Sequence, residues 1–281
     1  MAKRKNQNRD NRDQKFKKFK LSSGIVEPGQ YGIYATCTKG REAQCIKELK
    51  LLFGEKIEEY YHADLLAMTE GNDNVEEDGN EDVKKELLIE DQIKKELLEL
   101  KANNDDKKKS NALIKETKLG CECLIFLQCK KPIVPSEFCH RYCQEAFDSK
   151  IKTTRYTQRL SPIDSSCSAS LEEVIKLSKK ILKPHFQLEK DQKPLKFAIQ
   201  INRRNFSLLE KMDIIKAVAG CVGTEHGHSV DLKNYDKLIL IECFKTNVGM
   251  SVLDDYDRLC KYNLQQIFDK SHELEEGKSE N

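Results

Sequence analysis

Two groups of residues carry side chains that could bind zinc. Cys121 and Cys123 are two residues apart, and Cys139, His140 and Cys143 lie further along the chain. A structural zinc site needs four nitrogen or sulfur ligands, usually as tight pairs. A spacing of two on a strand, or of four on a helix, also places thiols together on one buried face. We therefore favour buried thiols over zinc in both groups, and we predict no metal ligand.

A third group combines Cys221 with His226 and His228, in a region that also contains glycine. Imidazole and thiolate are metal ligands, so a metal site is one interpretation. Two histidines in a glycine-containing loop are more often exposed to solvent or in contact with phosphate. We favour this second interpretation.

Motifs of nucleophilic catalysis and nucleotide binding are absent from the sequence. It contains no Gly-x-Ser-x-Gly turn, no Gly-x-x-x-x-Gly-Lys-Ser/Thr loop and no Gly-x-Gly-x-x-Gly after a strand. The eleven cysteines are spread over several apolar segments rather than placed near one base. We therefore predict no catalytic residue and no cofactor for this chain.

Basic side chains in the second half could bind the phosphates of a nucleic acid. Arg203 and Arg204 stand between an apolar strand and a predicted helix start, whose free amides and dipole favour an anion. Arginine can also clamp a phosphate or stack on a base. Residues 150–261 have only six more basic than acidic side chains, so charge alone favours ordinary surface residues. The candidates are Arg155, Arg159, Arg203, Arg204, Asn205, Lys216, Lys245 and Asn247.

Charge divides the 281 residues into blocks, although the net charge is only +2. Residues 1–20 have nine Lys and Arg against two Asp, and residues 70–106 have fourteen acids against five Lys. Such segments remain solvated, so we expect a basic tail and an acidic insertion. The number of cysteines is odd, and no apolar stretch follows the basic start or approaches the length of a membrane span. We expect free thiols, an intracellular protein and no membrane partner.

Apolar spacing in the first half predicts alternating strands and helices. A strand over residues 31–36 precedes a helix from about 39 to 53, which is expected to stop at Gly54. The later elements are a strand over 121–127, a helix capped by Ser136 and an extended segment over 155–162. This order suits a small ferredoxin-like α+β layer.

The second half repeats this alternation. Ser170 and Ser207 each begin a capping-box pattern, and Pro184 is expected to end the first of the two helices. Strands are predicted over residues 196–201, 237–244 and 249–253, with a last helix from Asp254 or Asp255.

Several segments of this half resemble the THUMP domain of RNA-modification proteins. They are Arg159-Leu-Ser-Pro162, Cys167, Phe197-Ala-Ile, Val230-Asp-Leu-Lys-Asn-Tyr-Asp236, Gly249-Met-Ser-Val252 and Lys261-Tyr-Asn-Leu-Gln265. Tyr235 stands where THUMP domains commonly have proline. With Gly32-Ile-Tyr-Ala-Thr-Cys37, the chain resembles the fungal branch of the eukaryotic THUMP adaptors for tRNA acetylation.

The resemblance implies a ferredoxin-like domain followed by an α/β THUMP domain. It also implies a non-catalytic adaptor that binds serine and leucine tRNAs for a separate RNA cytidine acetyltransferase. That enzyme would use acetyl-CoA and ATP to form N4-acetylcytidine in the D-arm. Related THUMP domains engage the tRNA acceptor end, which implies tRNA contacts in the region of the candidate residues. Asp231 matches a family position and is expected to be structural.

The expected domains are a basic disordered tail over residues 1–24, a ferredoxin-like domain over 25–152 with an acidic insertion at about 70–118, a THUMP domain with a C-terminal helix over 153–269, and a disordered tail over 270–281. The basic tail is typical of a nuclear import signal or an RNA-binding arm, so we expect a nuclear or nucleolar protein. Two alternatives are a fragment of a THUMP-containing RNA-modifying enzyme and a protein-interaction scaffold that uses the acidic insertion.

Overall fold

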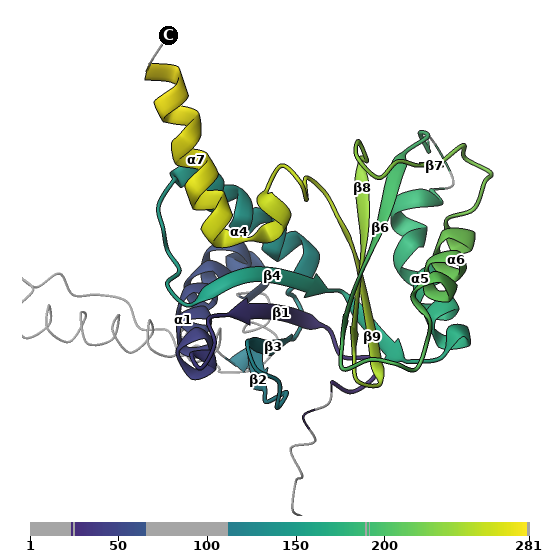
Figure 1. Ribbon diagram of the computed structural model, residues 1–281, viewed down its shortest axis with the longest axis horizontal. Helices are drawn as coiled ribbons and strands as arrows, with labels where there is room; N and C mark the ends of the chain where they lie inside the picture. The colour runs from purple at the N-terminus through teal and green to yellow at the C-terminus, as the bar shows by residue number, and fades with distance from the viewer. Residues whose placement is uncertain (1–23, 25, 66–111, 189, 191, 280–281) are drawn as a thin grey trace, which may run out of the picture.

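The computed structural model describes residues 24, 26–65, 112–188, 190 and 192–279. They form two β-sheets, each with helices against one face (Figure 1). The predicted basic tail and nearly all of the acidic insertion lie outside the described residues. Among the helices that the structure describes, none is both long enough and apolar enough to cross a membrane.

The first sheet is built from the first half of the chain and β4. Its elements are β1 (Gly32–Cys37), α1 (Glu42–Tyr60), β2 (Ile114–Thr117), β3 (Leu124–Cys129), α4 (Pro135–Ser149) and β4 (Thr157–Ile163). All neighbouring strands are antiparallel, in the order β2-β3-β1-β4. Phe53 of α1 packs against Phe138 and Tyr142 of α4, so both helices share one core with the sheet.

The second sheet contains both parallel and antiparallel strands. Its elements are β5 (Ser165–Ser168), α5 (Leu171–Phe186), β6 (Lys196–Arg204), α6 (Lys211–Val222), β7 (Ser229–Val230), β8 (Lys237–Phe244) and β9 (Asn247–Leu253). The strand order is β5-β9-β8-β6-β7, and β6 is parallel to β7 and β8. Side chains of β8 alternate, with Ile239 and Ile241 in the core under α5 and α6. Leu238 and Leu240 join the core of the first sheet, so the second sheet is covered on both faces.

The chain then returns to the first sheet (Figure 1). After β9 it forms the 3₁₀ turn η1 (Cys260–Tyr262) and α7 (Leu264–Ser279), which packs against α4 and β4. The predicted helix from Asp254 or Asp255 is therefore wrong, because residues 255 and 260–262 have left-handed backbone angles. The α7 backbone also continues as helix into residues 270–279, which the sequence analysis placed in a disordered tail.

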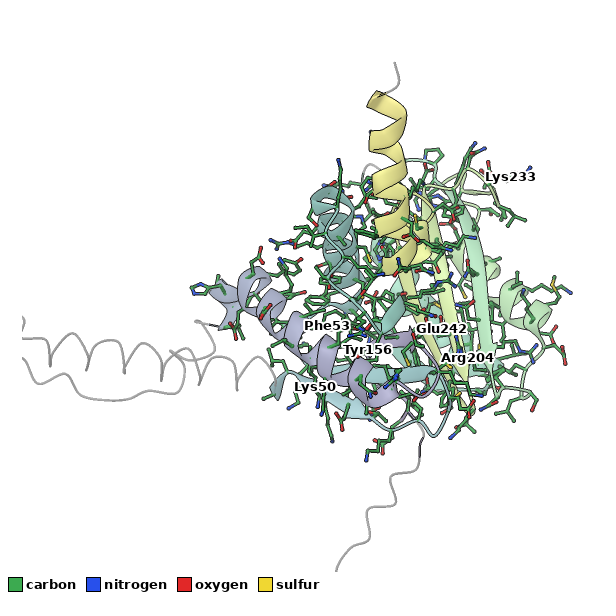
Figure 2. All side chains as sticks on the ribbon, turned by 60° about the vertical axis from the view of Figure 1, so that its left-hand side comes forward. Lys50, Phe53, Tyr156, Arg204, Lys233 and Glu242 are labelled. Atoms are coloured by element: carbon green, nitrogen blue, oxygen red, sulfur yellow. The ribbon has the colours of Figure 1, made fainter. Side chains whose placement is uncertain are left out.

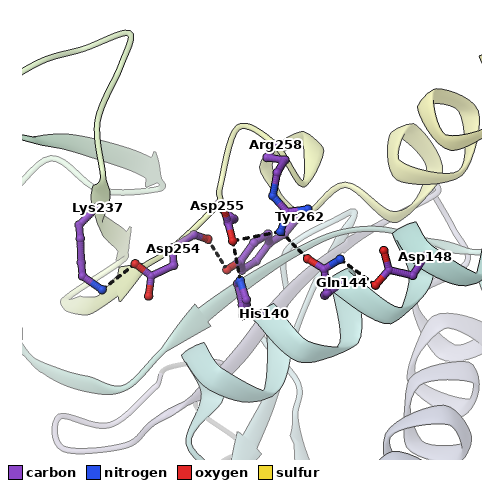
Figure 3. A network of polar contacts seen from close by, with 8 residues as sticks. All are labelled: His140, Gln144, Asp148, Lys237, Asp254, Asp255, Arg258 and Tyr262. Carbon is purple, nitrogen blue, oxygen red and sulfur yellow. Dashed lines mark hydrogen bonds and ion pairs between the residues drawn. The ribbon is translucent and has the colours of Figure 1, made fainter. Parts of the chain in front are cut away.

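A polar network fixes this returning segment (Figure 3). The Asp255 carboxylate accepts hydrogen bonds from His140 (3.3 Å) and Arg258 (3.0 Å), and Arg258 also donates to Gln144 of α4. The hydrogen bond from Arg258 holds the pKa of Asp255 below its ordinary value. The neighbouring Tyr262 hydroxyl donates to the Asp254 carbonyl. The segment that contains η1 is thereby attached to the first sheet.

Four sequence-based boundaries are corrected by the structure. Gly54 does not end α1, because it is buried inside a helix that continues to the buried Ile57. Pro184 lies inside α5. Ser136 is within α4, which begins at Pro135, and the predicted cap at Ser207 is replaced by a start at Lys211.

Some of the other expectations about the fold are confirmed. The cap at Ser170 is confirmed, because its side chain accepts a hydrogen bond from the Glu173 amide. The strand over residues 237–244 is also confirmed. Strand β2 lies within the segment expected to form the acidic insertion, and it pairs with β3. The second domain is expected from residue 153, and the chain changes sheets at Asp164, between β4 and β5.

The two sheets are held together by close contacts between β4 and β9. The Ser251 hydroxyl donates to the Pro162 carbonyl at 2.7 Å. A methyl group added at Gly249 would lie 2.5 Å from Ile163 Cγ2, so this position requires glycine. Lys245 adds a second connection, because its ammonium group donates to the Gly24 carbonyl at 2.8 Å and to the Leu119 carbonyl at 3.1 Å.

Asp164 carries a titratable group at the junction of the sheets. Its carboxylate accepts a hydrogen bond from the Ser136 amide at 2.9 Å, and its own amide donates to the Met250 carbonyl at 3.0 Å. Burial raises the pKa of Asp164 from 3.8 to about 6. Between these values the folded chain holds a proton that the unfolded chain has released, so the contribution of Asp164 to stability falls as pH rises.

We predict that Asp164→Asn makes the free energy of unfolding less dependent on pH. The wild-type protein should lose about 2 kcal/mol from this group between pH 4 and pH 7, because each unit of pKa corresponds to about 1.4 kcal/mol and the titration has already begun at pH 4. Urea unfolding at several pH values measures the difference between the two proteins. Asp148→Asn, at an exposed position of α4, is the control. Parallel curves for wild type and Asp164→Asn would contradict the prediction.

Candidate nucleic-acid interface

Arg159 of β4 and Arg204 of β6 line one pocket between the two sheets, with a volume of about 450 Å³. Lys39, which follows β1, contributes a third basic side chain. The Arg159 Nε is buried and has no hydrogen-bond partner within the described residues. The other lining residues are Thr36, Cys37, Thr38, Cys123, Gln158 and Asn263. A hollow with three cations and several hydroxyl and amide groups fits the anionic backbone of a nucleic acid.

A second pocket of about 530 Å³ continues from the first, because Arg159 lines both. It adds Lys261 of η1 and Lys270 of α7, together with Asp257 and Asp269. We call the two pockets together the junction groove. Its basic side chains come from β4, β6, η1, α7 and the turn after β1, so the groove exists only in the assembled fold.

Glu242 of β8 lies buried behind the two arginines. Figure 2 shows it beside Arg204 of the neighbouring strand. The Asn202 side-chain amide donates to Glu242 Oε1 at 2.6 Å, and Ser161 of β4 also hydrogen-bonds to the carboxyl group. Burial raises the pKa of Glu242, although Arg204 and Arg159 act in the opposite direction.

Glu48 of α1 holds the beginning of β4. Its carboxylate accepts hydrogen bonds from the Tyr156 amide at 3.2 Å and from the Thr157 amide and hydroxyl at 2.9 and 2.7 Å. The Arg155 amide donates to the same carboxylate. Hydrogen bonds to a charged acceptor are strong, so Glu48 fixes the strand that carries Arg159.

Of the predicted contact residues, the structure brings Arg159 and Arg204 together in the groove. Arg155 is exposed in the turn before β4, with its guanidinium 5.5 Å from the centre of the Tyr156 ring. Arg203 points to the opposite face of β6 from Arg204, because successive strand residues alternate. It donates to the Phe206 carbonyl at 3.1 Å.

The remaining predicted residues do not line the groove. Asn205 follows β6 with a left-handed φ of 49°, and Lys216 is exposed on α6, which covers the other face of the second sheet. The Lys245 ammonium group donates its hydrogen bonds to two backbone carbonyls of the first half of the chain. Asn247 is only 1% exposed, so it cannot reach a ligand without local opening.

Sequence reasoning missed Lys39, Lys261 and Lys270 as groove residues. Lys39 carried a usable signal, because it comes directly after a predicted strand, where a side chain stands at a sheet edge. Lys261 stands in a segment that resembles the family, but the sequence pattern did not reveal that the chain returns to the first sheet after β9, so neither Lys261 nor Lys270 could be placed in the groove. The Lys39 ammonium group forms an ion pair with the Glu122 carboxylate at 3.0 Å. This ion pair is exposed to solvent and stabilises the fold little, so Lys39 can leave Glu122 and bind a phosphate instead.

The cysteine and histidine groups lie in different environments. Across the described parts of the chain, no group of three or more metal-ligating side chains could hold an ion. Cys139 and Cys143 are buried, and burial raises the pKa of both thiols. Cys121 and Cys123 precede β3 in a turn rather than lying on a strand.

His228 is a structural residue. Its Nδ1 accepts a hydrogen bond from the Leu195 amide at 3.1 Å, so its Nε2 carries the proton and donates to the Phe186 carbonyl at 2.8 Å. Both ring nitrogens are therefore hydrogen-bonded within the protein, although the side chain is partly exposed as expected. His226 is partly exposed, with its ring centre 5.9 Å from that of His228.

Comparison with known proteins identifies related chains. The THUMP domain family matches residues 168–253. The tRNA acetyltransferase TAN1 of Saccharomyces cerevisiae is 46% identical over 99% of both chains. THUMP domain-containing protein 1 of Bos taurus is 29% identical over 89% of this chain and 66% of its own length. Among solved structures, PH1313 of Pyrococcus horikoshii aligns with 79% of this chain and 54% of its own, at 13% identity and a TM-score of 0.40.

We predict that Glu48→Gln weakens both the fold and RNA binding. The neutral amide loses charge-assisted hydrogen bonds to the start of β4, which should lower the free energy of unfolding by about 2 kcal/mol. Because Arg159 is on the same strand, affinity for tRNA should fall severalfold at a temperature where the variant is folded. Urea unfolding and filter binding measure the two effects. Glu55→Gln, exposed on the same helix, is the matched control and should change neither.

Proposed function

Because this chain belongs to the family of THUMP-domain proteins of tRNA acetylation, we propose that it is a non-catalytic adaptor. In this proposal it binds serine and leucine tRNAs and presents them to an RNA cytidine acetyltransferase. The enzyme forms N4-acetylcytidine in the D-arm and uses acetyl-CoA and ATP, whereas the adaptor needs no cofactor. The observation that carries the proposal is the junction groove, with Arg159 and Arg204 in one pocket of a THUMP-containing chain.

The physical role of such an adaptor is positioning. Cations on fixed strands bind the backbone of a folded RNA, and their geometry selects its shape rather than its sequence. An RNA held at one end is confined near an enzyme that binds the same adaptor. The effective concentration of the target cytidine at the active site then rises without a new bond at the reacting atom.

A second candidate function is catalysis by this chain itself, which the name of the yeast relative, tRNA acetyltransferase, favours. A thiol nucleophile would need a lowered pKa. The pKa of Cys37, Cys45, Cys139, Cys143, Cys167 and Cys243 is instead raised by burial. These thiols do not support a covalent acetyl-enzyme. Because acetyl transfer can also be direct, our preference for the adaptor rests on the absence of a catalytic motif in the sequence and on the junction groove. Acetyl transfer to tRNA by the purified chain alone would reverse this preference.

We also propose the following organisation. A ferredoxin-like class for the first sheet is supported by its β-α-β-β-α-β order and its strand order β2-β3-β1-β4. A nuclear or nucleolar location is supported by the nine basic residues among residues 1–20, which lie outside the described residues. We propose the domain division expected from the sequence, with the boundary between the ferredoxin-like and THUMP domains at Asp164 instead of residue 153.

We predict that cells without this protein lack N4-acetylcytidine in serine and leucine tRNAs. The acetyltransferase remains present but loses the bound substrate, so its product should fall to background. Mass spectrometry of the purified tRNAs measures the nucleoside, and re-expression of the wild-type chain is the control. An unchanged N4-acetylcytidine content would refute the adaptor function.

We predict that Arg159→Gln and Arg204→Gln each weaken tRNA binding and its dependence on salt. A cation that contacts a phosphate releases counterions on binding, so each loss should reduce the salt slope by about one. Affinity measured between about 50 and 200 mM salt gives this slope. Lys176→Gln on α5 is the control, because Lys176 is exposed and pairs only with Glu173. A slope that remains the same in the two arginine variants would contradict the assignment of the groove.

A further inference from the structure

Strand β6 has an open edge. On one side it pairs with β8 from Phe197 to Arg204, but on the other side β7 pairs only with Lys196 and Phe197. In the part of the chain that the structure describes, no strand pairs with residues 198–204 on that side. Figure 1 shows β7 beside one end of β6. The burial of the side chains agrees with this arrangement. Strand β9, which has neighbours on both sides, is buried throughout, whereas β6 is partly exposed.

An unpaired strand edge offers a row of backbone N–H and C=O groups to another chain. Folded proteins usually block such an edge with proline, a bulge or a covering segment. Residues 198–204 contain no proline, and their pairing with β8 continues without a register shift. This edge is seven residues long, which is the length of an ordinary strand, and Ile199, Ile201 and Arg203 direct their backbone groups to it. It can therefore hold an extended peptide.

Apolar side chains lie beside the edge. Ile199 and Ile201 of β6 line a pocket of about 200 Å³ with Leu232 and Tyr235, which belong to the segment between β7 and β8. Leu232 is 75% exposed, although it is a large apolar side chain. A phosphate backbone gains nothing from such a side chain, whereas an apolar residue of a peptide would bury it. These contacts favour a peptide over RNA at this edge.

The charged side chains at this pocket define the partner further. Lys211 and Lys261 line it, against one acid, Asp257. Lys261 lies 4.0 Å from Asp257, while Lys211 forms no ion pair with any described residue. A complementary peptide therefore carries acidic side chains near Lys211 and apolar side chains near Leu232.

We propose that the open edge of β6 binds an extended acidic and apolar segment of the acetyltransferase, which adds to the second sheet as a further strand. This inference rests on the proposed function for the identity of the partner. Arg204 ends β6 and also lines the junction groove, so the enzyme segment and the RNA are bound next to each other. The same strand thereby connects the substrate to the enzyme that modifies it.

The test compares Leu232→Asp with Leu51→Asp in the full-length protein. Both leucines are exposed, Leu51 at 63% on α1, so neither change disturbs a core. Binding to purified acetyltransferase is measured by biolayer interferometry, and tRNA affinity by filter binding. We expect Leu232→Asp to weaken enzyme binding at least tenfold and Leu51→Asp to leave it unchanged. Both variants should bind tRNA within twofold of the wild type.

Hydrogen exchange provides a second measurement. Addition of the acetyltransferase to the wild-type protein should slow amide exchange at Ile199, Ile201 and Arg203. Their backbone groups face the open edge, because strand residues alternate and the Phe197 carbonyl already accepts from Asp231 on that side. Lys211→Glu should weaken enzyme binding in the same way as Leu232→Asp. If the enzyme binds with equal affinity to all variants and residues 198–204 exchange as before, the edge is not the docking site.

The outcomes separate this inference from the proposed function. If Leu232→Asp weakens tRNA binding as strongly as enzyme binding, the edge belongs to the RNA surface and the inference is wrong while the adaptor function stands. If the wild-type protein does not bind the acetyltransferase at all, the proposed function and the inference both fail. Loss of enzyme binding with unchanged tRNA affinity and slowed exchange supports the inference.

Discussion

The junction groove depends on the fixed orientation of the two sheets, because Arg159 and Arg204 belong to different sheets. The contact of β4 with β9 maintains this orientation. Gly249 allows Ile163 to approach the β9 backbone, and Ser251 donates a hydrogen bond to the neighbouring Pro162 carbonyl. A larger residue at position 249 would clash with the Ile163 side chain, at the contact between the two sheets.

The buried polar groups behind the groove serve the same arrangement. Glu242 connects β8 to β6 through Asn202 and to β4 through Ser161, so it hydrogen-bonds to both sheets at once. A buried polar group is costly unless it is hydrogen-bonded, and this cost favours the one orientation in which its partners are present. The positive side chains are thus placed by a structure that is already fixed before RNA arrives, which reduces the entropy lost on binding.

Different parts of the second sheet are suited to different ligands. The face toward the first sheet carries Arg204 and contributes to a polar, basic groove. The edge of β6 offers unpaired backbone groups and the exposed Leu232. Phosphate binding uses cations, whereas strand addition uses backbone hydrogen bonds and apolar burial. Two ligands can therefore bind to adjoining surfaces through different kinds of interaction, although Lys261 and Asp257 line both the groove and the pocket beside the edge.

The sequence by itself determined the local elements and the family. The continuous apolar run of β8 predicted a buried strand, and Ser170 with Glu173 predicted a helix start, because both signals depend on neighbouring residues. The Val230–Asp236 segment was recognisable as part of a THUMP domain for the same reason, since it is continuous in the chain.

Only the tertiary structure decided which basic residues share a surface. It placed Lys261 in the groove by returning the chain to α4, and it turned Lys245 and Asn247 inward, where one binds backbone carbonyls and the other is buried. Charge and spacing do not contain this information. The direction of each side chain depends on strand pairing and packing between residues that are far apart in the sequence.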